Sequence, residues 1–224
     1  MKFLLCSSGI SNASIEDALV DLLGKPIADS SALCISTGIL PFPGGPAHAY
    51  RFISGATRSP MVGLGWKSLG VLELTALPSV TREYWTADVE EVDALLVWGG
   101  SPRYLCYWMR ESGLADLLPS LRPETVWVGT SGGAMVATPD FGGVTYDDME
   151  LLTGSDDALG LVDFSVFPHL DREDGLPPTP QEEIEAWAAG LSVPAYVIDD
   201  HTAIKVVDGD VDVISEGRWM LLGA

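Results

Sequence analysis

The chain has 224 residues, of which 32 are acidic and 12 are basic, and its formal net charge is −20. A duplex nucleic-acid binder needs a basic face and an anionic membrane surface repels an acidic protein, so this charge excludes nucleic acid and membrane as partners. Because 47% of the residues are hydrophobic and seven are Trp, the composition is that of a folded protein and excludes a disordered one.

The sequence has no feature of a secreted, repetitive or linker-divided protein. The first apolar run ends at Ser7, far short of the roughly 7–15 residues of a signal-peptide core, and no stretch approaches the ~20 apolar residues of a membrane span. Cys6, Cys34 and Cys106 are widely spaced, as expected for small core residues in a reducing compartment. We therefore expect one cytoplasmic domain over residues 1–224, without a metal site.

Strand-like and helix-like segments alternate through the first 140 residues. Ser14 followed by Asp17 is typical of a helix N-cap, and Gly24 is expected to end that helix. Apolar runs predict strands at residues 3–7, 32–36, 71–74, 92–98 and 125–128, and helices at residues 47–53, 102–111 and from 134 onward. This alternation favours an α/β fold with a mostly parallel sheet and helices on both faces.

The last third of the chain has a different pattern. A strand at residues 164–167 and a helix at 181–189 precede four short strands, predicted at residues 196–198, 203–207, 211–214 and 218–221. The turn Asp208-Gly209-Asp210 is a typical hairpin signal. We expect these strands to close the fold as an antiparallel meander of hairpins.

The segment Gly129-Thr130-Ser131-Gly132-Gly133 matches the pattern Gly-x-Ser-x-Gly between an apolar strand and a helix start. In this context the pattern indicates a nucleophile elbow, in which a serine at a strained turn projects its hydroxyl from the carboxyl edge of the sheet. Glycines two positions before and after the serine permit the sharp turn. The N–H of Gly132, at the helix start, can donate to an oxyanion.

A nucleophilic serine needs a base, and the sequence offers three histidines. His169 directly follows a strand, so it is expected at the sheet edge that carries the elbow, whereas His48 lies in a Pro/Gly loop and His201 at a strand junction. The carboxylate that should orient the imidazole stays open between two pairs, Asp199-Asp200 and Asp147-Asp148. The chain order of α/β-hydrolases would favour the second pair.

Four segments together resemble a known family. Trp98-Gly99-Gly100-Ser101, the elbow at 129–134, Phe167-Pro168-His169 and residues 198–204 follow the order and spacing of the peptidase E family (aspartyl dipeptidases, S51), which also contains cyanophycinases. The resemblance spans nearly the whole chain. It implies a three-layer, flavodoxin-like α/β fold similar to class I glutamine amidotransferases, with serine in place of their cysteine.

The resemblance also implies a function, the hydrolysis of small peptides through an acyl-enzyme without a metal or cofactor. We expect a monomer or a homodimer. We also expect it to bind a small peptide as its substrate. The resemblance implies Ser131 as the nucleophile, His169 as the base and Asp200 as the acid, with Asp148 as the alternative acid. It also implies the N–H groups of Gly100 and Gly132 as the oxyanion donors.

One departure from the family pattern concerns the substrate. Aspartyl dipeptidases carry, after the His, an Arg that pairs with the N-terminal Asp of the substrate, and Pro180 stands at that place here. Residues 140–224 also hold 19 acidic side chains against three basic ones. Because a guanidinium–carboxylate pair supplies both charge and bidentate geometry, we expect acidic substrates to bind poorly unless Arg172 or Arg103 substitutes.

Two other functions stay open on the sequence. The elbow could serve an esterase or amidase in which Asp148 completes the site. The chain could also be a non-catalytic, ligand-binding member of the family. Two departures motivate that hypothesis: residues 98–102 read Trp-Gly-Gly-Ser-Pro where the family commonly has Gly-Gly-Gly-Asn-Thr, and Pro180 stands where the Arg is expected. A further departure is His201, which stands in place of a usual Gly.

Overall fold

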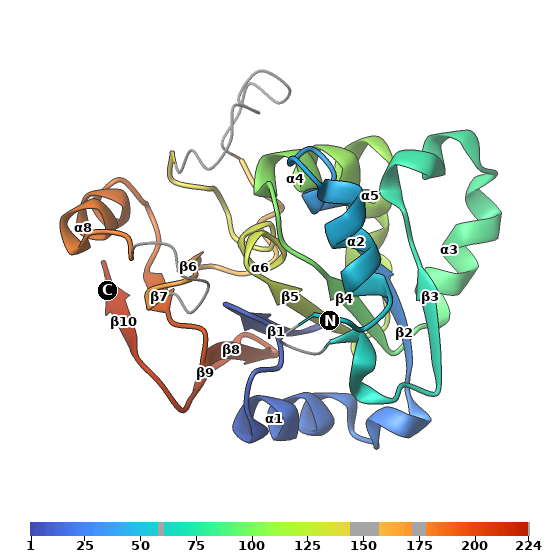
Figure 1. The fold of residues 1–224 in the computed structure, drawn as a ribbon, viewed down its shortest axis with the longest axis horizontal. Helices are drawn as coiled ribbons and strands as arrows, with labels where there is room; N and C mark the ends of the chain where they lie inside the picture. The colour runs from blue at the N-terminus through green and yellow to red at the C-terminus, as the bar shows by residue number, and fades with distance from the viewer. Residues whose placement is uncertain (58–60, 144–156, 172–177, 224) are drawn as a thin grey trace.

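The computed structural model describes residues 1–57, 61–143, 157–171 and 178–223, which build two β-sheets and the helices that pack on them (Figure 1). The strands of the larger sheet are β1 Lys2–Cys6, β2 Ser31–Ile35, β3 Ser68–Val71, β4 Ala94–Val97, β5 Val126–Thr130, β8 Thr202–Val207 and β9 Asp210–Ser215. They lie in the order β3-β2-β4-β5-β1-β8-β9. The first five pair in parallel, and β8 and β9 follow antiparallel.

Helices cover both faces of this sheet, which confirms the predicted fold class. Their bounds are α1 Ala13–Leu23, α2 Gly45–Ile53, α3 Arg82–Glu91, α4 Pro102–Glu111, α5 Leu114–Leu117 and α6 Gly132–Met135. Successive strand side chains point to opposite faces, so Leu4 packs in the core under α1 while Phe3 and Leu5 pack in the core under α3, α4, α5 and α6.

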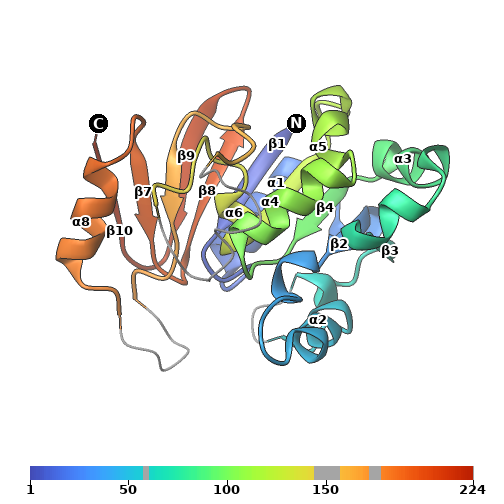
Figure 2. The ribbon, with the colours of Figure 1, turned by 90° about the horizontal axis from the view of Figure 1, so that it is seen from above.

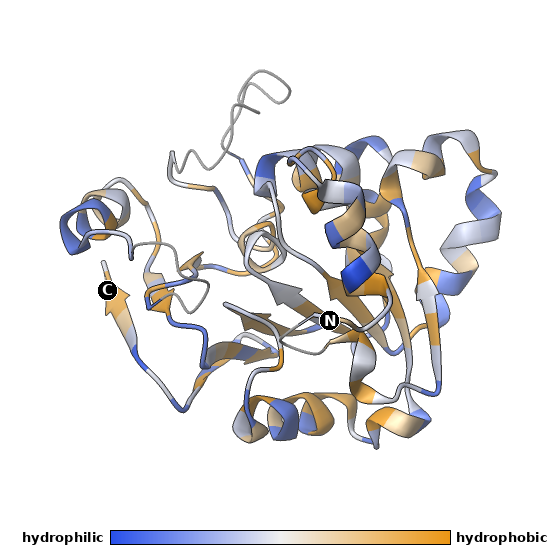
Figure 3. Ribbon diagram, viewed as in Figure 1, coloured by the Kyte–Doolittle hydropathy of each residue, from blue (hydrophilic) through white to orange (hydrophobic). Residues whose placement is uncertain are grey.

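The carboxyl ends of the parallel strands point to one edge of the sheet. Figure 2 shows α2 beyond the ends of β2 and β4 at this edge, and Phe52 of α2 stacks on Trp98 with ring centroids 4.5 Å apart. Figure 3 shows hydrophobic residues gathered on the strands of the larger sheet and polar residues on the outer turns of α3. No helix in the described part of the chain is long and apolar enough to span a membrane.

A second, smaller sheet packs against a helix of its own. Its strands are β6 Ser165–Phe167, β7 Ala195–Ile198 and β10 Trp219–Leu222, and its helix is α8 Gln181–Ala189. β7 is central, parallel to β6 and antiparallel to β10. Trp187 of α8 packs edge-on against Phe167 with ring centroids 5.1 Å apart, and both side chains are buried.

The C-terminal strands therefore do not form one meander. β8 and β9 make the predicted hairpin, whose turn residues Asp208 and Gly209 have φ angles of 51° and 89°, as a type I′ turn requires. β7 and β10 instead leave the larger sheet and pair with each other. The prediction of a continuous meander is wrong because β10 turns away after Gly217 to pair with β7 rather than with its sequence neighbour β9.

The predicted cap of the first helix is also wrong. Asn12 is the N-cap, and its side chain accepts the N–H of Ile15 at 3.0 Å. Ser14 instead donates from its hydroxyl and its N–H to Glu216 of the C-terminal segment, and these bonds lower the pKa of the Glu216 carboxyl. The predicted end is confirmed, since Gly24 has φ 67° and its N–H bonds to the last turn.

Elsewhere the structure shifts or adds elements. The strand expected at residues 71–74 lies at Ser68–Val71, because Leu72 and Leu74 are buried in the turn that follows rather than on the strand. α3 and α5 were not predicted. The signal for α3 was available, since Trp85 and Val89 are four residues apart and both buried, the spacing of one helix face.

The turn from β5 into α6 depends on glycines that lie against backbone. A Cβ on Gly133 would overlap the carbonyl oxygen of Val97, and one on Gly129 would overlap the carbonyl oxygen of Gly133. Neither glycine has a positive φ, so the reason for glycine is close approach rather than conformational freedom. The elbow therefore sits directly on the end of β4, with no side chain between them.

We expect Gly133→Ala to lower the free energy of unfolding by roughly 3 kcal/mol, because the backbone of Val97 has to move to admit the methyl group. Urea unfolding followed by tryptophan fluorescence measures the change. The matched control is Gly190→Ala, since Gly190 has φ −83° and its added Cβ would come no closer than 3.4 Å to another atom. Equal unfolding midpoints for the two variants would contradict the close-approach explanation.

All three cysteines are buried free thiols, as predicted for core residues. Burial raises the pKa of Cys34 and of Cys106 to about 11, and it raises the pKa of Cys6 further. Since the thiolate is the reactive form, both inaccessibility and protonation protect these side chains.

We expect the native protein to leave a thiol reagent such as Ellman's reagent unreacted at mildly alkaline pH. All three thiols should react once guanidinium unfolds the chain, with a denaturant dependence that follows global unfolding. A thiol that reacts in the native state would show that one of these sites opens locally.

Candidate active site

Ser131 stands between β5 and α6 in a backbone conformation that residues other than glycine rarely adopt. Its φ is 53° and its ψ −121°, and its N–H donates to the carbonyl of Cys6 at the end of β1 at 3.0 Å. A non-glycine residue held at such angles is strained, and the strain persists only where surrounding structure fixes it. Here the hydrogen bond to β1 and the glycine contacts with β4 fix the turn.

His169 follows β6 and also has a positive φ, 64°. Its Nε2 lies 3.0 Å from the hydroxyl of Ser131, which is within hydrogen-bonding distance. The neighbouring N–H of Leu170 donates to the carbonyl of Ile198 at 3.0 Å and so ties the loop to the end of β7. The side chain of His169 is 23% exposed, so the ring can be reached from solvent.

Asp200 lies on the other side of the imidazole. Its Oδ1 is 2.8 Å from Nδ1 of His169, and its side chain is only 11% exposed. Serine, histidine and aspartate thus form a continuous hydrogen-bonded series that comes from the ends of β5, β6 and β7. A hydroxyl, an imidazole and a carboxylate in this order can transfer the hydroxyl proton to the ring.

The adjacent Asp199 has a different set of contacts. Its Oδ1 accepts the hydroxyl of Thr202 at 2.6 Å and the N–H of His201 at 3.1 Å, and its Oδ2 accepts the N–H of Arg218. These bonds hold the turn between β7 and β8 to the start of β10. Asp199 therefore supports the turn that carries Asp200 rather than contacting the imidazole.

The two other histidines lie outside this hydrogen-bonded series. His48 is an exposed residue of α2. His201 is held by its backbone, since its carbonyl accepts from Asn12 and from the N–H of Glu216.

Gly100 and Gly132, the two glycines predicted to donate to an oxyanion, lie against each other next to the Ser131 turn. A Cβ on Gly99 would come within 2.8 Å of the Ser131 Cβ, and one on Gly132 would meet the carbonyl oxygen of Gly100. Gly100 itself has φ 114° and lies against the carbonyl of Gly38. The loop after β4 therefore runs along the elbow, backbone against backbone.

One residue of this site was missed by the sequence analysis. Ser7 directly follows β1 and is fully buried. Its hydroxyl lies 2.7 Å from Oδ1 of Asp200 and 2.8 Å from the backbone nitrogen of His169. A signal was available, because the carboxyl ends of neighbouring parallel strands form functional sites together, and residue 7 ends the first predicted strand.

The remaining candidate residues either lie elsewhere in the fold or fall outside the part of the chain that the structure describes. Asp148 and Arg172 fall outside the described residues. Pro180 directly precedes α8. Arg103, in the first turn of α4, is 2% exposed, and its guanidinium lies 5.9 Å from the centre of the Phe141 ring.

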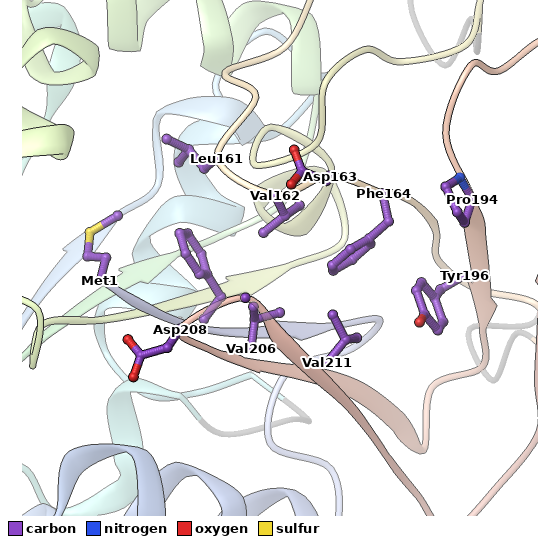
Figure 4. Close-up of a pocket in the computed structure, with 12 residues that line it drawn as sticks. Met1, Leu161, Val162, Asp163, Phe164, Pro194, Tyr196, Val206, Asp208 and Val211 are labelled. Atoms are coloured by element: carbon purple, nitrogen blue, oxygen red, sulfur yellow. The ribbon is translucent and has the colours of Figure 1, made fainter. Parts of the chain in front are cut away.

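The described residues contain no group of three or more His, Cys, Asp or Glu side chains arranged to hold a metal ion. A cavity of about 360 Å³ lies at the opposite end of β1, between Phe3, Phe164 and Val206 (Figure 4). Its walls include neither Ser131 nor His169. The hydrogen-bonded series is therefore not part of this cavity.

Comparison with known proteins agrees with this fold. A comparison with curated proteins finds no match. Among solved structures, a candidate peptidase E protein from Listeria monocytogenes EGD-e has a TM-score of 0.67 at 20% identity, over 96% of this chain and 98% of that one. A peptidase from an acI-B1 Actinobacterium has a TM-score of 0.55 at 17% identity, over 100% of this chain and 94% of that one.

At these identities the two structures show a shared fold. The family model described as Peptidase family S51 matches residues 60–214, a span that includes the elbow, His169 and Asp200. The chain therefore belongs to peptidase family S51 and is a serine-type peptidase.

Proposed function

We propose that this protein hydrolyses small peptides through an acyl-enzyme on Ser131, with His169 as general base and Asp200 as the carboxylate that orients the ring. The observation that carries the proposal is the series of two contacts, 3.0 Å from Ser131 Oγ to His169 Nε2 and 2.8 Å from His169 Nδ1 to Asp200 Oδ1. The strained φ of Ser131 supports it, because such strain is typical of a nucleophile elbow.

In the first half-reaction, Ser131 Oγ attacks the carbonyl carbon of the scissile peptide bond while its proton passes to Nε2 of His169. The carbonyl π electrons move to the oxygen, which becomes an oxyanion. When the tetrahedral intermediate collapses, the C–N bond breaks and the imidazolium returns the proton to the leaving amine. The products are the free amine and the acyl ester of Ser131.

In the second half-reaction, water replaces the amine. The water oxygen attacks the ester carbonyl while His169 takes a proton from the water. The imidazolium then gives the proton to Ser131 Oγ as the ester bond breaks. We propose the N–H groups of Gly100 and Gly132 as donors to the oxyanion in both halves. Gly132 begins α6, and the N–H groups at a helix N-terminus favour negative charge such as that of the oxyanion.

We further propose that the preferred substrates have neutral rather than acidic N-terminal side chains. Pro180 stands where aspartyl dipeptidases place the recognising Arg, and the first turn of α8 that follows carries exposed Glu182 and Glu183. Most of the net charge also lies in residues 140–224, which supply His169 and Asp200. An acidic substrate would approach against this field.

We expect Ser131→Ala to lower peptide hydrolysis by on the order of 10⁴-fold or more, because no other group can form the acyl-enzyme. Hydrolysis of a dipeptide panel, read by mass spectrometry of the products, measures the loss. A fluorophosphonate probe should add its mass to Ser131 in the wild type and leave the variant unmodified.

The matched control for this experiment is Ser112→Ala, a buried serine at the end of α4, which should retain wild-type hydrolysis and labelling. Thermal unfolding of both variants shows whether the fold is intact. Peptide hydrolysis that survives in Ser131→Ala would refute the proposed nucleophile. Turnover of esters without turnover of peptides would favour an esterase instead.

We expect neutral dipeptides such as Ala-Leu to have a higher kcat/KM than Asp-Leu at low ionic strength. The difference should narrow as salt is added, because salt screens the repulsion between an acidic substrate and the acidic C-terminal part. Steady-state kinetics at two ionic strengths test this. Cleavage of Asp-Leu well above Ala-Leu at low salt would show that another cation replaces the family's Arg.

A further inference from the structure

The hydroxyl of Ser7 meets three groups of the proposed site at once. It lies 2.7 Å from Oδ1 of Asp200, 2.8 Å from the backbone nitrogen of His169 and 3.3 Å from the Nδ1 of the same ring. Ser7 is fully buried, so no solvent competes for these contacts. The hydroxyl therefore lies between the main chain of His169 and the carboxylate that its ring contacts.

The direction of each hydrogen bond follows from the chemistry of the groups. A backbone N–H can only donate, so the Ser7 oxygen accepts from His169. An ionised carboxylate can only accept, so the single Ser7 proton points to Asp200. The proton is then not available to Nδ1 of His169, and that nitrogen must carry its own proton to bond Asp200 at 2.8 Å. The Nε2 lone pair is left facing the Ser131 hydroxyl.

Ser7 is itself fixed by the elbow. Its carbonyl accepts the hydroxyl of Thr130 at 3.0 Å, and the carbonyl of Cys6 accepts the N–H of Ser131 at 3.0 Å. β1 pairs with β5 on one side and β8 on the other. The end of β1 thus touches the strand that carries Ser131 and, through the Ser7 hydroxyl, both other members of the series.

We infer that Ser7 is a positioning residue that sets the tautomer and orientation of His169 through Asp200. This inference rests on the proposed function, in which His169 must present an unprotonated Nε2 to Ser131. Without the Ser7 hydroxyl, Asp200 Oδ1 loses the donor at 2.7 Å and the N–H of His169 loses the hydroxyl that accepts it. The carboxylate and the strained His169 backbone are then both freer to turn.

The kinetic test is Ser7→Ala, assayed on the best dipeptide substrate. We expect kcat to fall by about 10- to 100-fold with KM little changed, since a hydrogen bond to a charged group is lost without a change in substrate contacts. Ser7→Thr keeps a hydroxyl at the same position and should recover part of kcat.

The control is Ser112→Ala. Ser112 is also buried, and its hydroxyl likewise accepts one N–H, from Leu114, and donates to one oxygen, that of Met109. It should lose stability comparable to that of Ser7→Ala while keeping wild-type kcat. A kcat for Ser7→Ala equal to that of Ser112→Ala would overturn the inference.

A spectroscopic measurement tests the same inference without any turnover. The chain has three histidines, so His169→Gln assigns the His169 signals in a ¹H–¹⁵N spectrum of the imidazole nitrogens. The wild type should show the Nδ1–H form with a downfield Nδ1 proton. Ser7→Ala should broaden or lose that proton and shift the nitrogens toward a mixture of tautomers, whereas unchanged signals would overturn the inference.

The two proposals fail in different ways. If Ser131→Ala still hydrolyses peptides, the proposed function fails and the imidazole spectrum alone decides the role of Ser7. If Ser131→Ala is inactive while Ser7→Ala keeps both the wild-type kcat and the wild-type spectrum, the proposed function stands and the positioning role of Ser7 is wrong.

Discussion

The loop after β4 and the turn after β5 meet backbone against backbone, and glycines on both segments permit the close approach. Gly133 lies against the carbonyl of Val97, and Gly132 against that of Gly100. Because no side chain separates the two segments, neither can shift without moving the other. Together with the hydrogen bond from Ser131 to β1, this contact holds the angles of Ser131. It also brings the segments of the two proposed oxyanion donors together at the elbow.

The polar groups of the site are held at the ends of strands that belong to both sheets. β5 supplies Ser131, the loop after β6 supplies His169, and the turn after β7 supplies Asp200. Asp200 is nearly buried, and a buried carboxylate is stable only when it receives hydrogen bonds. The bonds from Ser7 and His169 satisfy this requirement and at the same time orient the imidazole, so the conditions for stability and for chemistry coincide here.

Much of this arrangement could be predicted from the sequence because its signals are local. The elbow lies in one short segment, and helices α4 and α8 have the predicted bounds. The predictions that failed depended on contacts between distant segments. Ser14 does not cap α1 because it hydrogen-bonds to Glu216, and β10 does not pair with β9 because it pairs with β7. Choosing between Asp199 and Asp200 likewise required the position of Thr202 and Arg218, which no spacing rule supplies.

The hydrogen bond between Ser7 and Asp200 joins residues 193 positions apart, and its consequence concerns folding. Contacts so distant in sequence form late, since loop closure precedes any gain from them. A partly folded chain would lack the oriented imidazole. The proposed hydrogen-bonded series would then be complete only when the whole fold has formed, so the site and the finished fold would appear together.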